Sequence, residues 1–296
     1  NMRNQLMQIR DFGGRHKLPS ELQFQLMSFI RFKFSTHDEV DQSLLSGLPD
    51  MYRQRINFFL FEDIIRGVGI FENCASVFLR QLHGSFKAAL YMPDQQLATI
   101  DGPCMSLQII AEGEVELLSR SGGVIDVRGE GECFTAVSFL CKVGQPYSVR
   151  TRMVCRALSI GDSAWEAACT AFPGNLLQVR HNLLLHCKEK VAEFMPTTLA
   201  FNIYSEVLAT VQQHLVQQEE LNIALLCSSA ARGDLGDIKR RVVAQSPNCS
   251  NYDRRTPLHL AAAHGQPEAC RLLLDAEAEV DPIDNFGRTP LFEACR

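Results

Sequence analysis

Apolar residues recur with a helical period in the first part of this chain. Over residues 18–67 they are spaced three to four apart, which predicts amphipathic helices. Pro19 and Pro49 stand where the two predicted helices begin, because proline suits the first turn of a helix. The apolar positions are Leu22, Leu26, Phe29 and Ile30 in the first helix and Ile56, Leu60 and Ile64 in the second.

The middle of the chain is predicted to consist of short strands. Its β-prone segments are brief and are separated by Gly, Pro and Asp, which is typical of strands in a small antiparallel barrel. Gly122 and Gly123 predict a hairpin turn between two of them. The predicted strands are Gln96–Ile100, Leu107–Glu112, Val115–Ser119, Val124–Val127, Val149–Met153 and Arg156–Ile160.

A single apolar stripe follows the predicted strands. Ile203, Val207, Val211 and Leu215 are four residues apart on an otherwise Gln-rich segment. One stripe of this length is too short to specify a coiled coil, so we expect a helix that packs on the barrel and connects it to the next domain.

The last part of the chain repeats itself. Residues 255–258 (RTPL) recur as residues 288–291, a spacing of 33 residues that is the ankyrin period. An earlier unit aligns Ala230, Ala231 and Gly233 with Ala262, Ala263 and Gly265, although its TPLH sequence has decayed, so it resembles a capping repeat. Because such repeats are stable only when stacked, we expect further repeats after residue 296.

Composition limits the possible functions. The chain has 296 residues, 46% of them apolar, and a net charge of −5 without a basic stripe, which argues for several domains and against nucleic acid as a partner. Its eleven cysteines show no C-x-x-C pair, so we interpret them as reduced cytosolic thiols. No apolar run reaches the ~18 residues that a membrane span needs, so the fragment itself is expected to be soluble.

Five stretches, from three successive modules, together resemble the cytosolic region of plant Shaker-type voltage-gated potassium channels. Residues 18–34 (LPSELQFQLMSFIRFKF) and 44–74 are similar to the helical C-linker, and residues 109–115 (IIAEGEV) and 145–150 (QPYSVR) to the cyclic-nucleotide-binding homology domain. Residues 218–235 (QEELNIALLCSSAARGDL) resemble the outward-rectifying branch at its entry into the ankyrin repeats. The resemblance covers nearly the whole chain, and its specificity lies in the order of the modules.

The resemblance implies a cyclic-nucleotide pocket, and this chain departs from it. Ligand-binding members carry Phe-Gly-Glu on a short helix and an Arg that pairs with the phosphate, because these groups contact the ribose and the anion. Losing two such contacts weakens binding by roughly two to four orders of magnitude. We therefore expect a vestigial pocket, no cofactor and weak cyclic-nucleotide binding unless Arg150 or Arg152 substitutes. The pocket positions are Phe134, Thr135, Ala136, Val137, Pro146, Tyr147, Ser148 and Arg150.

No other constellation predicts chemistry. The chain contains no phosphate loop, nucleophile elbow or metal-ligand pattern, so we expect no enzyme and no catalytic residue. His181 and His186 are five residues apart, which is not the spacing of two zinc ligands on one helix face. Cys133, Cys141 and Cys155 could sense redox state if clustered, but buried cysteines more often behave as small hydrophobic residues.

The predicted fold is multidomain α+β. It consists of C-linker helices (1–67), a jelly-roll-like antiparallel β-barrel with flanking helices (68–190), a helical connector (191–220) and truncated ankyrin repeats (221–296). The predicted function is regulation and assembly at the cytoplasmic face of a tetrameric membrane channel, with identical or related subunits and an unknown ankyrin-binding protein as partners, and membrane contact only through a pore domain. The alternative is a soluble cyclic-nucleotide-responsive scaffold with ankyrin partner binding.

Overall fold

The computed structural model describes residues 2–20, 22–24, 26–27, 30, 49–243 and 245–296. It divides the chain into two compact units. The first comprises Asn1–Ala168 with Ala192–Tyr204, and the second comprises Cys169–Val191 with Ser205–Arg296. The domain boundaries proposed from the sequence, at residues 67, 190 and 220, stay a prediction.

The described N-terminal residues are largely helical. Helix α1 spans Met2–Arg15 and helix α4 spans Asp50–Gly67, directly after Pro49 as the sequence predicted. Helical residues are also found among 20–30, where Leu22 is exposed and Ile30 is buried. Phe29 of the predicted apolar stripe lies outside the described residues.

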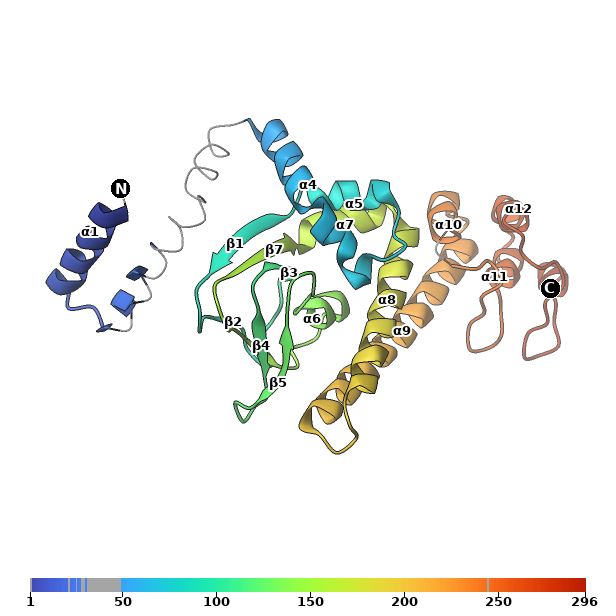
Figure 1. Ribbon diagram of the computed structural model, residues 1–296. Coiled ribbons are helices and arrows are strands. Elements are labelled where there is room, and N and C mark those ends of the chain that lie inside the picture. The colour runs from blue at the N-terminus through green and yellow to red at the C-terminus, as the bar shows by residue number, and fades with distance from the viewer. Residues whose placement is uncertain (1, 21, 25, 28–29, 31–48, 244) are drawn as a thin grey trace. The chain divides into compact units, whose positions relative to one another are not determined.

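The seven strands found among the described residues form two open antiparallel sheets (Figure 1). One sheet has the order β1-β7-β3, and the other has the order β2-β6-β4-β5. Antiparallel pairing is therefore confirmed, but the pairing of the described strands leaves both sheets unclosed, and the jelly-roll arrangement stays a prediction. The strands are β1 (Lys87–Tyr91), β2 (Gln96–Ala98), β3 (Ser106–Glu112), β4 (Val115–Leu118), β5 (Val124–Arg128), β6 (Ser148–Thr151) and β7 (Cys155–Gly161).

Two glycine turns shape these sheets. Gly122 has a φ of 81° and closes the predicted hairpin, in which Ser119 N–H donates to the Gly123 carbonyl. Gly113 has a φ of 93° and carries the chain from β3 in one sheet to β4 in the other. A Cβ added at Gly113 would lie 2.5 Å from the Val154 carbonyl oxygen, so only glycine fits this turn.

Short helices complete the first unit. They are the 3₁₀ turn η1 (Gly69–Phe71), α5 (Ser76–His83), α6 (Ala136–Cys141) and α7 (Asp162–Ala171). Trp165 on α7 is buried in an aromatic cluster, with edge-on contacts to Phe78 and Phe139 at centroid distances of 6.1 and 5.9 Å. This cluster joins α5, α6 and α7 to one another, because aromatic side chains bury large apolar areas.

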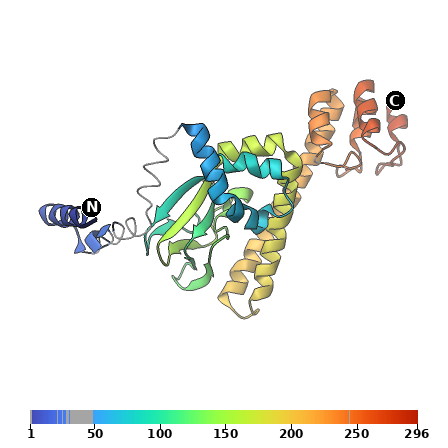
Figure 2. The same cartoon turned by 45° about the horizontal axis from the view of Figure 1, so that its top comes forward.

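Two long helices run side by side, and most of each belongs to the second unit (Figures 1 and 2). Helix α8 spans Pro173–Glu193 and helix α9 spans Leu199–Arg232, and Arg180 donates to the Gln218 side chain at 3.3 Å. Val207 and Val211 of the predicted stripe are buried. Helix α9 continues without a break into the predicted capping repeat.

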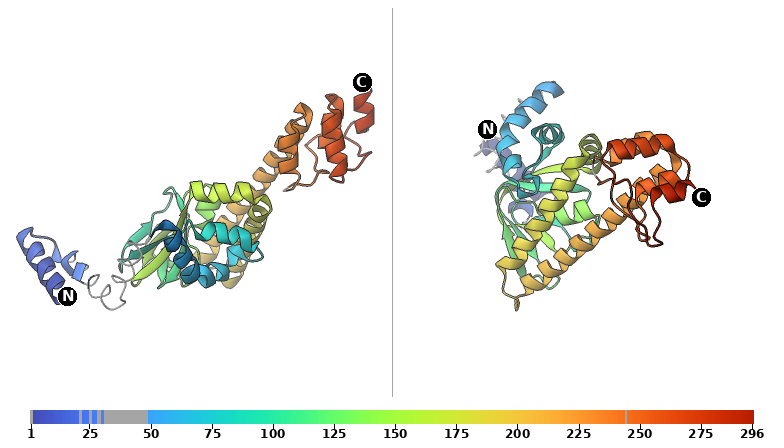
Figure 3. Two further views of the ribbon diagram at one scale, coloured as in Figure 1. Left: turned by 90° about the horizontal axis from the view of Figure 1, so that it is seen from above. Right: turned by 90° about the vertical axis from the view of Figure 1, so that its right-hand side faces the viewer.

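The repeats stand in a row (Figure 3), and the end of α9 pairs with α10 (Leu235–Arg241). The next repeat contains α11 (Pro257–Ala263) and α12 (Pro267–Asp275), and α13 (Pro290–Ala294) begins the third. Gly233 and Gly265 end their helices in the same way, with φ values of 69° and 63° and N–H donation to the carbonyls of Ala230 and Ala262. This agreement confirms the alignment of the first repeat.

The repeat period also reappears in the loops. Asn251 and Asp284 each accept two backbone N–H groups through the side chain, from the residues two and four positions later. His259 of the TPLH sequence links neighbouring repeats, since its two ring nitrogens contact Thr256 and the Arg288 carbonyl. Within the described part of the chain, no helix is long and apolar enough to cross a bilayer.

Candidate functional site

The predicted pocket segment runs from the end of β5 through α6 to β6. Phe134, Thr135, Ala136 and Val137 are all buried at the start of α6. They belong to the core, and their side chains are not presented to solvent. Tyr147 is also buried, whereas Pro146, Ser148 and Arg150 are partly exposed.

The hydroxyl of Thr135 makes hydrogen bonds within the protein as both donor and acceptor. Its Oγ1 accepts the backbone N–H of Gln108 at 2.8 Å and donates to the Ser106 carbonyl at 3.1 Å. Both partners belong to β3, so Thr135 fastens the start of α6 to that strand. The hydrogen-bonding capacity of this hydroxyl is therefore used within the protein.

Gln145 is a second fastening residue, and sequence reasoning missed it. Its side chain is buried, donates through Nε2 to the Phe134 carbonyl at 2.9 Å and accepts from the Ser138 hydroxyl. Its backbone pairs with Asp101 and Gly102. The signal in the sequence was a lone amide between Gly144 and Pro146, which by itself does not distinguish a buried clamp from a surface residue.

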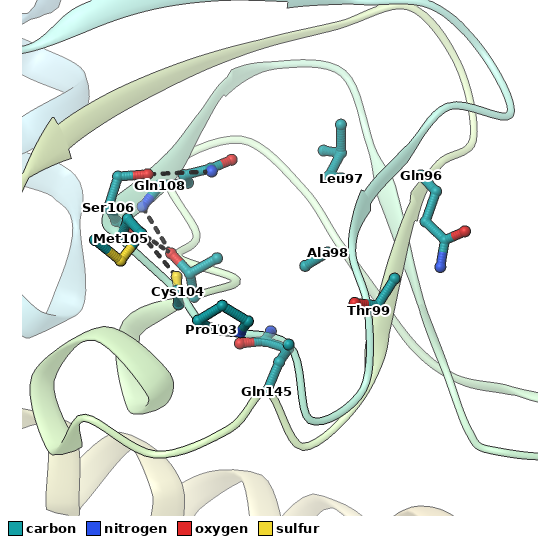
Figure 4. A pocket seen from close by; sticks show the side chains of 12 residues that line it. Gln96, Leu97, Ala98, Thr99, Pro103, Cys104, Met105, Ser106, Gln108 and Gln145 are labelled. Carbon is teal, nitrogen blue, oxygen red and sulfur yellow. Dashed lines mark hydrogen bonds between the residues drawn. The ribbon is translucent and has the colours of Figure 1, made fainter.

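A cavity of about 220 Å³ lies beside these two residues (Figure 4). Of the eight predicted pocket residues, only Thr135 lines it. It is smaller than the ~300–1,000 Å³ typical of small-molecule sites, and none of the described side chains that line it carries a charge. The lining residues are Gln96, Leu97, Ala98, Thr99, Gly102, Pro103, Cys104, Met105, Ser106, Gln108, Thr135 and Gln145.

Arg150, the candidate phosphate partner, is engaged elsewhere. It lies opposite Glu116 in the β4–β6 pair and donates to that carboxylate at 2.9 Å, and its Nε is 4.0 Å from Asp94. The hydrogen bond to Glu116 is the main reason that the pKa of Arg150 is raised. Arg152 likewise pairs with Glu114 at 3.2 Å. An incoming phosphate would have to compete with these carboxylates for either arginine.

A buried cation that the sequence did not reveal lies at the end of β5. Arg128 is 2% exposed and bonds to Glu132 at 2.8 Å and to the Tyr204 hydroxyl at 3.0 Å. The same hydroxyl donates to Asp126 at 2.7 Å, and the Tyr204 ring stacks on Phe194. We call these four residues, Asp126, Arg128, Glu132 and Tyr204, the Arg128 cluster. It ties β5 to the first turns of α9.

The electrostatic surroundings within the cluster fix the protonation states of Arg128 and Tyr204. Burial opposes the charge on Arg128, but the surrounding Tyr147, Tyr204 and Glu132 outweigh it and raise the pKa. Burial also raises the pKa of Tyr204, and Asp126 adds to this effect. Arg128 therefore stays charged and Tyr204 stays protonated at physiological pH, so the hydrogen bond between them persists across the neutral range.

Cys133 and Cys155 show no sign of activation. Both are thiols, and burial raises the pKa of Cys133 to about 12 and that of Cys155 to about 11. Because the thiolate is the reactive form, both side chains are poor nucleophiles at neutral pH. This supports their interpretation as small core residues.

Comparison with known proteins first identifies the repeat class. Residues 224–296 match the family model described as ankyrin repeats in three copies. The chain therefore contains ankyrin repeats, as predicted.

Over most of its length the chain is similar to potassium channels of plants. It is 28% identical over 270 residues to potassium channel AKT1 of Oryza sativa subsp. indica, and 27% identical over 287 residues to potassium channel AKT1 of Arabidopsis thaliana. It is 26% identical over 278 residues to potassium channel SKOR of Arabidopsis thaliana. These alignments cover 88%, 94% and 92% of this chain but only 28%, 32% and 32% of the relatives, so the chain spans about a third of their length.

Proposed function

We propose that this chain is the cytosolic regulatory and assembly region of a voltage-gated potassium channel. The observation that carries the proposal is the similarity to plant potassium channels, which extends from the N-terminal helices through the two sheets into the ankyrin repeats. On this proposal the pore precedes residue 1. The outward-rectifying branch is our more specific assignment, and it is supported by the resemblance at residues 218–235, where α9 runs directly into the repeats.

In the proposed mechanism the sheet unit transmits force and does not sense a ligand. Four copies of the N-terminal helices would form a ring below the pore, and tilting of the ring would act on the pore-lining helices. A unit that transmits such a movement must be rigid. The Arg128 cluster and the Thr135 hydrogen bonds provide that rigidity, because each joins segments far apart in the sequence, and Gln145 adds bonds to the start of α6.

The ligand arm of the proposal is tested by calorimetry. Cyclic AMP and cyclic GMP should bind only in the millimolar range, since the cavity is small and uncharged and Arg150 is already paired. An Arg150→Ala variant serves as the control, because it removes the one arginine that lies in the predicted pocket segment. A low-micromolar dissociation constant that is lost in this variant would favour the second candidate function, a cyclic-nucleotide-responsive scaffold.

The channel arm is tested by the sequence that precedes this chain and by assembly. Six apolar spans and a Thr-x-Gly-Tyr/Phe-Gly filter upstream of residue 1 are expected, and their absence would contradict the proposal. Cross-linking of the full-length protein should give tetramers, and deletion of residues 1–67 should reduce their yield. A tetramer yield that is unaffected by this deletion would show that the N-terminal helices do not form the ring.

A further inference from the structure

A second, larger cavity lies wholly within the second unit. It measures about 770 Å³ and is bordered by the start of α8, the middle of α9 and the residues of α10 and just after it. We call it the α8–α10 cleft. Its volume falls in the ~300–1,000 Å³ range of pockets that bind ligands, and neither the proposed gating role nor the ankyrin repeats account for it.

The two walls of the cleft differ in chemistry. The α8 wall is mainly apolar. It includes Leu176 and Leu177, the second of which is exposed, with Arg180 further along the helix. The opposite wall, on α10, carries Lys239, Arg240 and Arg241. A cleft with one apolar and one cationic wall fits an occupant that carries both apolar and anionic groups, because each wall then meets its complement.

The cleft is strongly positive although the protein is negative. Four cationic side chains line it, with Arg180 as the fourth, against the single carboxylate of Asp237, in a chain of net charge −5. Arg240 is 72% exposed, and among the described residues Lys239 has no acidic partner. The cationic wall therefore has charge available for an incoming anion.

Asp237 organises the cationic wall. Its carboxylate accepts from Arg241 at 2.6 Å, from Arg240 at 3.1 Å and from the Ser229 hydroxyl. The hydrogen bonds from Arg241 and Ser229 hold the pKa of Asp237 below its usual value. The carboxylate is thus ionised at neutral pH and fixes both guanidinium groups in place before any ligand arrives, which lowers the entropy lost on binding.

The same chain carries a segment of complementary character. The turn that follows α12 has four exposed carboxylates within seven residues, and the described part of the chain offers none of them an ion pair. The exposed side chains of Val280 and Ile283 lie in and next to it. We call residues 275–281 the acidic turn. Its carboxylates belong to Asp275, Glu277, Glu279 and Asp281.

The acidic turn is held in shape by one side chain. Asn248 donates to the Glu277 carbonyl at 3.3 Å and accepts from the Glu279 N–H at 2.7 Å. Both bonds use backbone groups of the turn, so the side-chain carboxylates of Glu277 and Glu279 take no part in them. A rigid, multiply charged turn loses little freedom when it docks.

We propose that the α8–α10 cleft of one copy of this chain binds the acidic turn of a second copy. Four carboxylates would face a cleft of net charge +3, and Val280 and Ile283 would cover the apolar wall at Leu176 and Leu177. The contact joins different surfaces of identical chains, so it propagates from copy to copy and can close into a ring. It goes beyond the proposed function, since it concerns a contact between subunits that neither channel activity nor repeat stacking requires.

A charge-swap experiment on the whole chain tests this contact. The cleft variant is Lys239→Glu with Arg240→Glu, and the turn variant is Glu277→Lys with Glu279→Lys. Self-association is followed by sedimentation equilibrium at high protein concentration and low salt. Each variant alone should associate about tenfold more weakly than the unmodified chain, and circular dichroism should show unchanged helix content.

The decisive sample is an equimolar mixture of the two variants. In the mixture, the negative cleft of one variant meets the positive turn of the other and the two native surfaces also meet, so association should return. Arg271→Glu, an exposed reversal on α12 outside the cleft, is the matched control and should have no effect. The proposal is overturned if the unmodified chain stays monomeric, if the single variants associate normally, or if the mixture associates no better than either variant alone.

Discussion

Replacing Tyr204 by Phe removes one hydroxyl from the centre of the Arg128 cluster. That hydroxyl donates to Asp126 at 2.7 Å and accepts from Arg128 at 3.0 Å, and the side chain is 3% exposed. Hydrogen bonds to charged groups contribute about 1.5–3 kcal/mol each. Asp126 and Arg128 keep their own 3.3 Å contact and Glu132 remains bonded, so part of this free energy is retained. We expect a loss of about 2 kcal/mol in the free energy of unfolding of the first unit.

The chain has a built-in probe for this measurement. Trp165 is its single tryptophan and is buried in the first unit, so the fluorescence change during urea unfolding reports on that unit. A loss of about 2 kcal/mol corresponds to a fall in melting temperature of about 4–8 °C for a unit of this size. Tyr252→Phe is the matched control, because its side chain is 89% exposed and the change should stay within about 0.5 kcal/mol.

A double-mutant cycle separates this mechanism from a general packing defect. Arg128→Met should destabilise the unit by about 3 kcal/mol, because it leaves the partly buried carboxylates of Asp126 and Glu132 without their cation. The double variant Arg128→Met/Tyr204→Phe should be destabilised by at least about 1 kcal/mol less than the sum of the two single-variant losses, because the two residues interact directly. Two results would show that the Arg128 cluster does not stabilise the unit in this way. One is a loss of unfolding free energy in Tyr204→Phe no larger than in the Tyr252→Phe control. The other is a double variant whose loss equals the sum of the two single losses, as for distant sites.

Three further outcomes follow from the structure. Gly113→Ala should unfold the sheet unit in the fluorescence assay, whereas Gly122→Ala, which shares the positive φ but has open space around it, should cost only about 1 kcal/mol; equal effects would contradict the close-approach argument. Arg255 and the N–H groups of Phe286 and Arg288 outweigh burial and lower the pKa of Asp284, so its contribution to stability is complete above pH ~4 and is lost as the pH falls through the lowered folded-state pKa. The urea midpoint of the helical circular dichroism signal should fall accordingly, and an unchanged pH slope in Asp284→Asn would refute the assignment. Backbone hydrogen exchange should be fast over Pro290–Ala294, where two large apolar side chains are exposed. Strong protection of these amides would contradict the expectation that this helix has low local stability.

The repeats could be predicted from the sequence because the same residues recur there at a fixed spacing. The 33-residue recurrence of RTPL fixes helix starts, and the structure repeats the same hydrogen bonds at Asn251 and Asp284. The six predicted strands were likewise found within a few residues, since alternation marks one buried face. Strand β1 was missed because Ala88 and Ala89 interrupt the apolar alternation on which that inference depends.

The candidate site was harder to predict because its contacts are not local. Arg128 and Tyr204 are 76 residues apart, and nothing in their neighbouring residues indicates that they meet. The pairing of Arg150 with Glu116 depends on the register between β4 and β6, which is known only once the strands are aligned. The departure from the ligand-binding pattern at residues 134–137 stays a prediction. Sequence reasoning could not show that these side chains form part of the core.

The central claim is that the chain regulates a potassium channel without sensing a cyclic nucleotide. The most direct test is recording from excised patches that contain the full-length protein, with the cytosolic face open to the bath. The account predicts a potassium-selective current that depends on voltage and is unchanged when cyclic AMP or cyclic GMP is added at micromolar concentration. The absence of a potassium current, or a current that opens with micromolar cyclic nucleotide at fixed voltage, would contradict it.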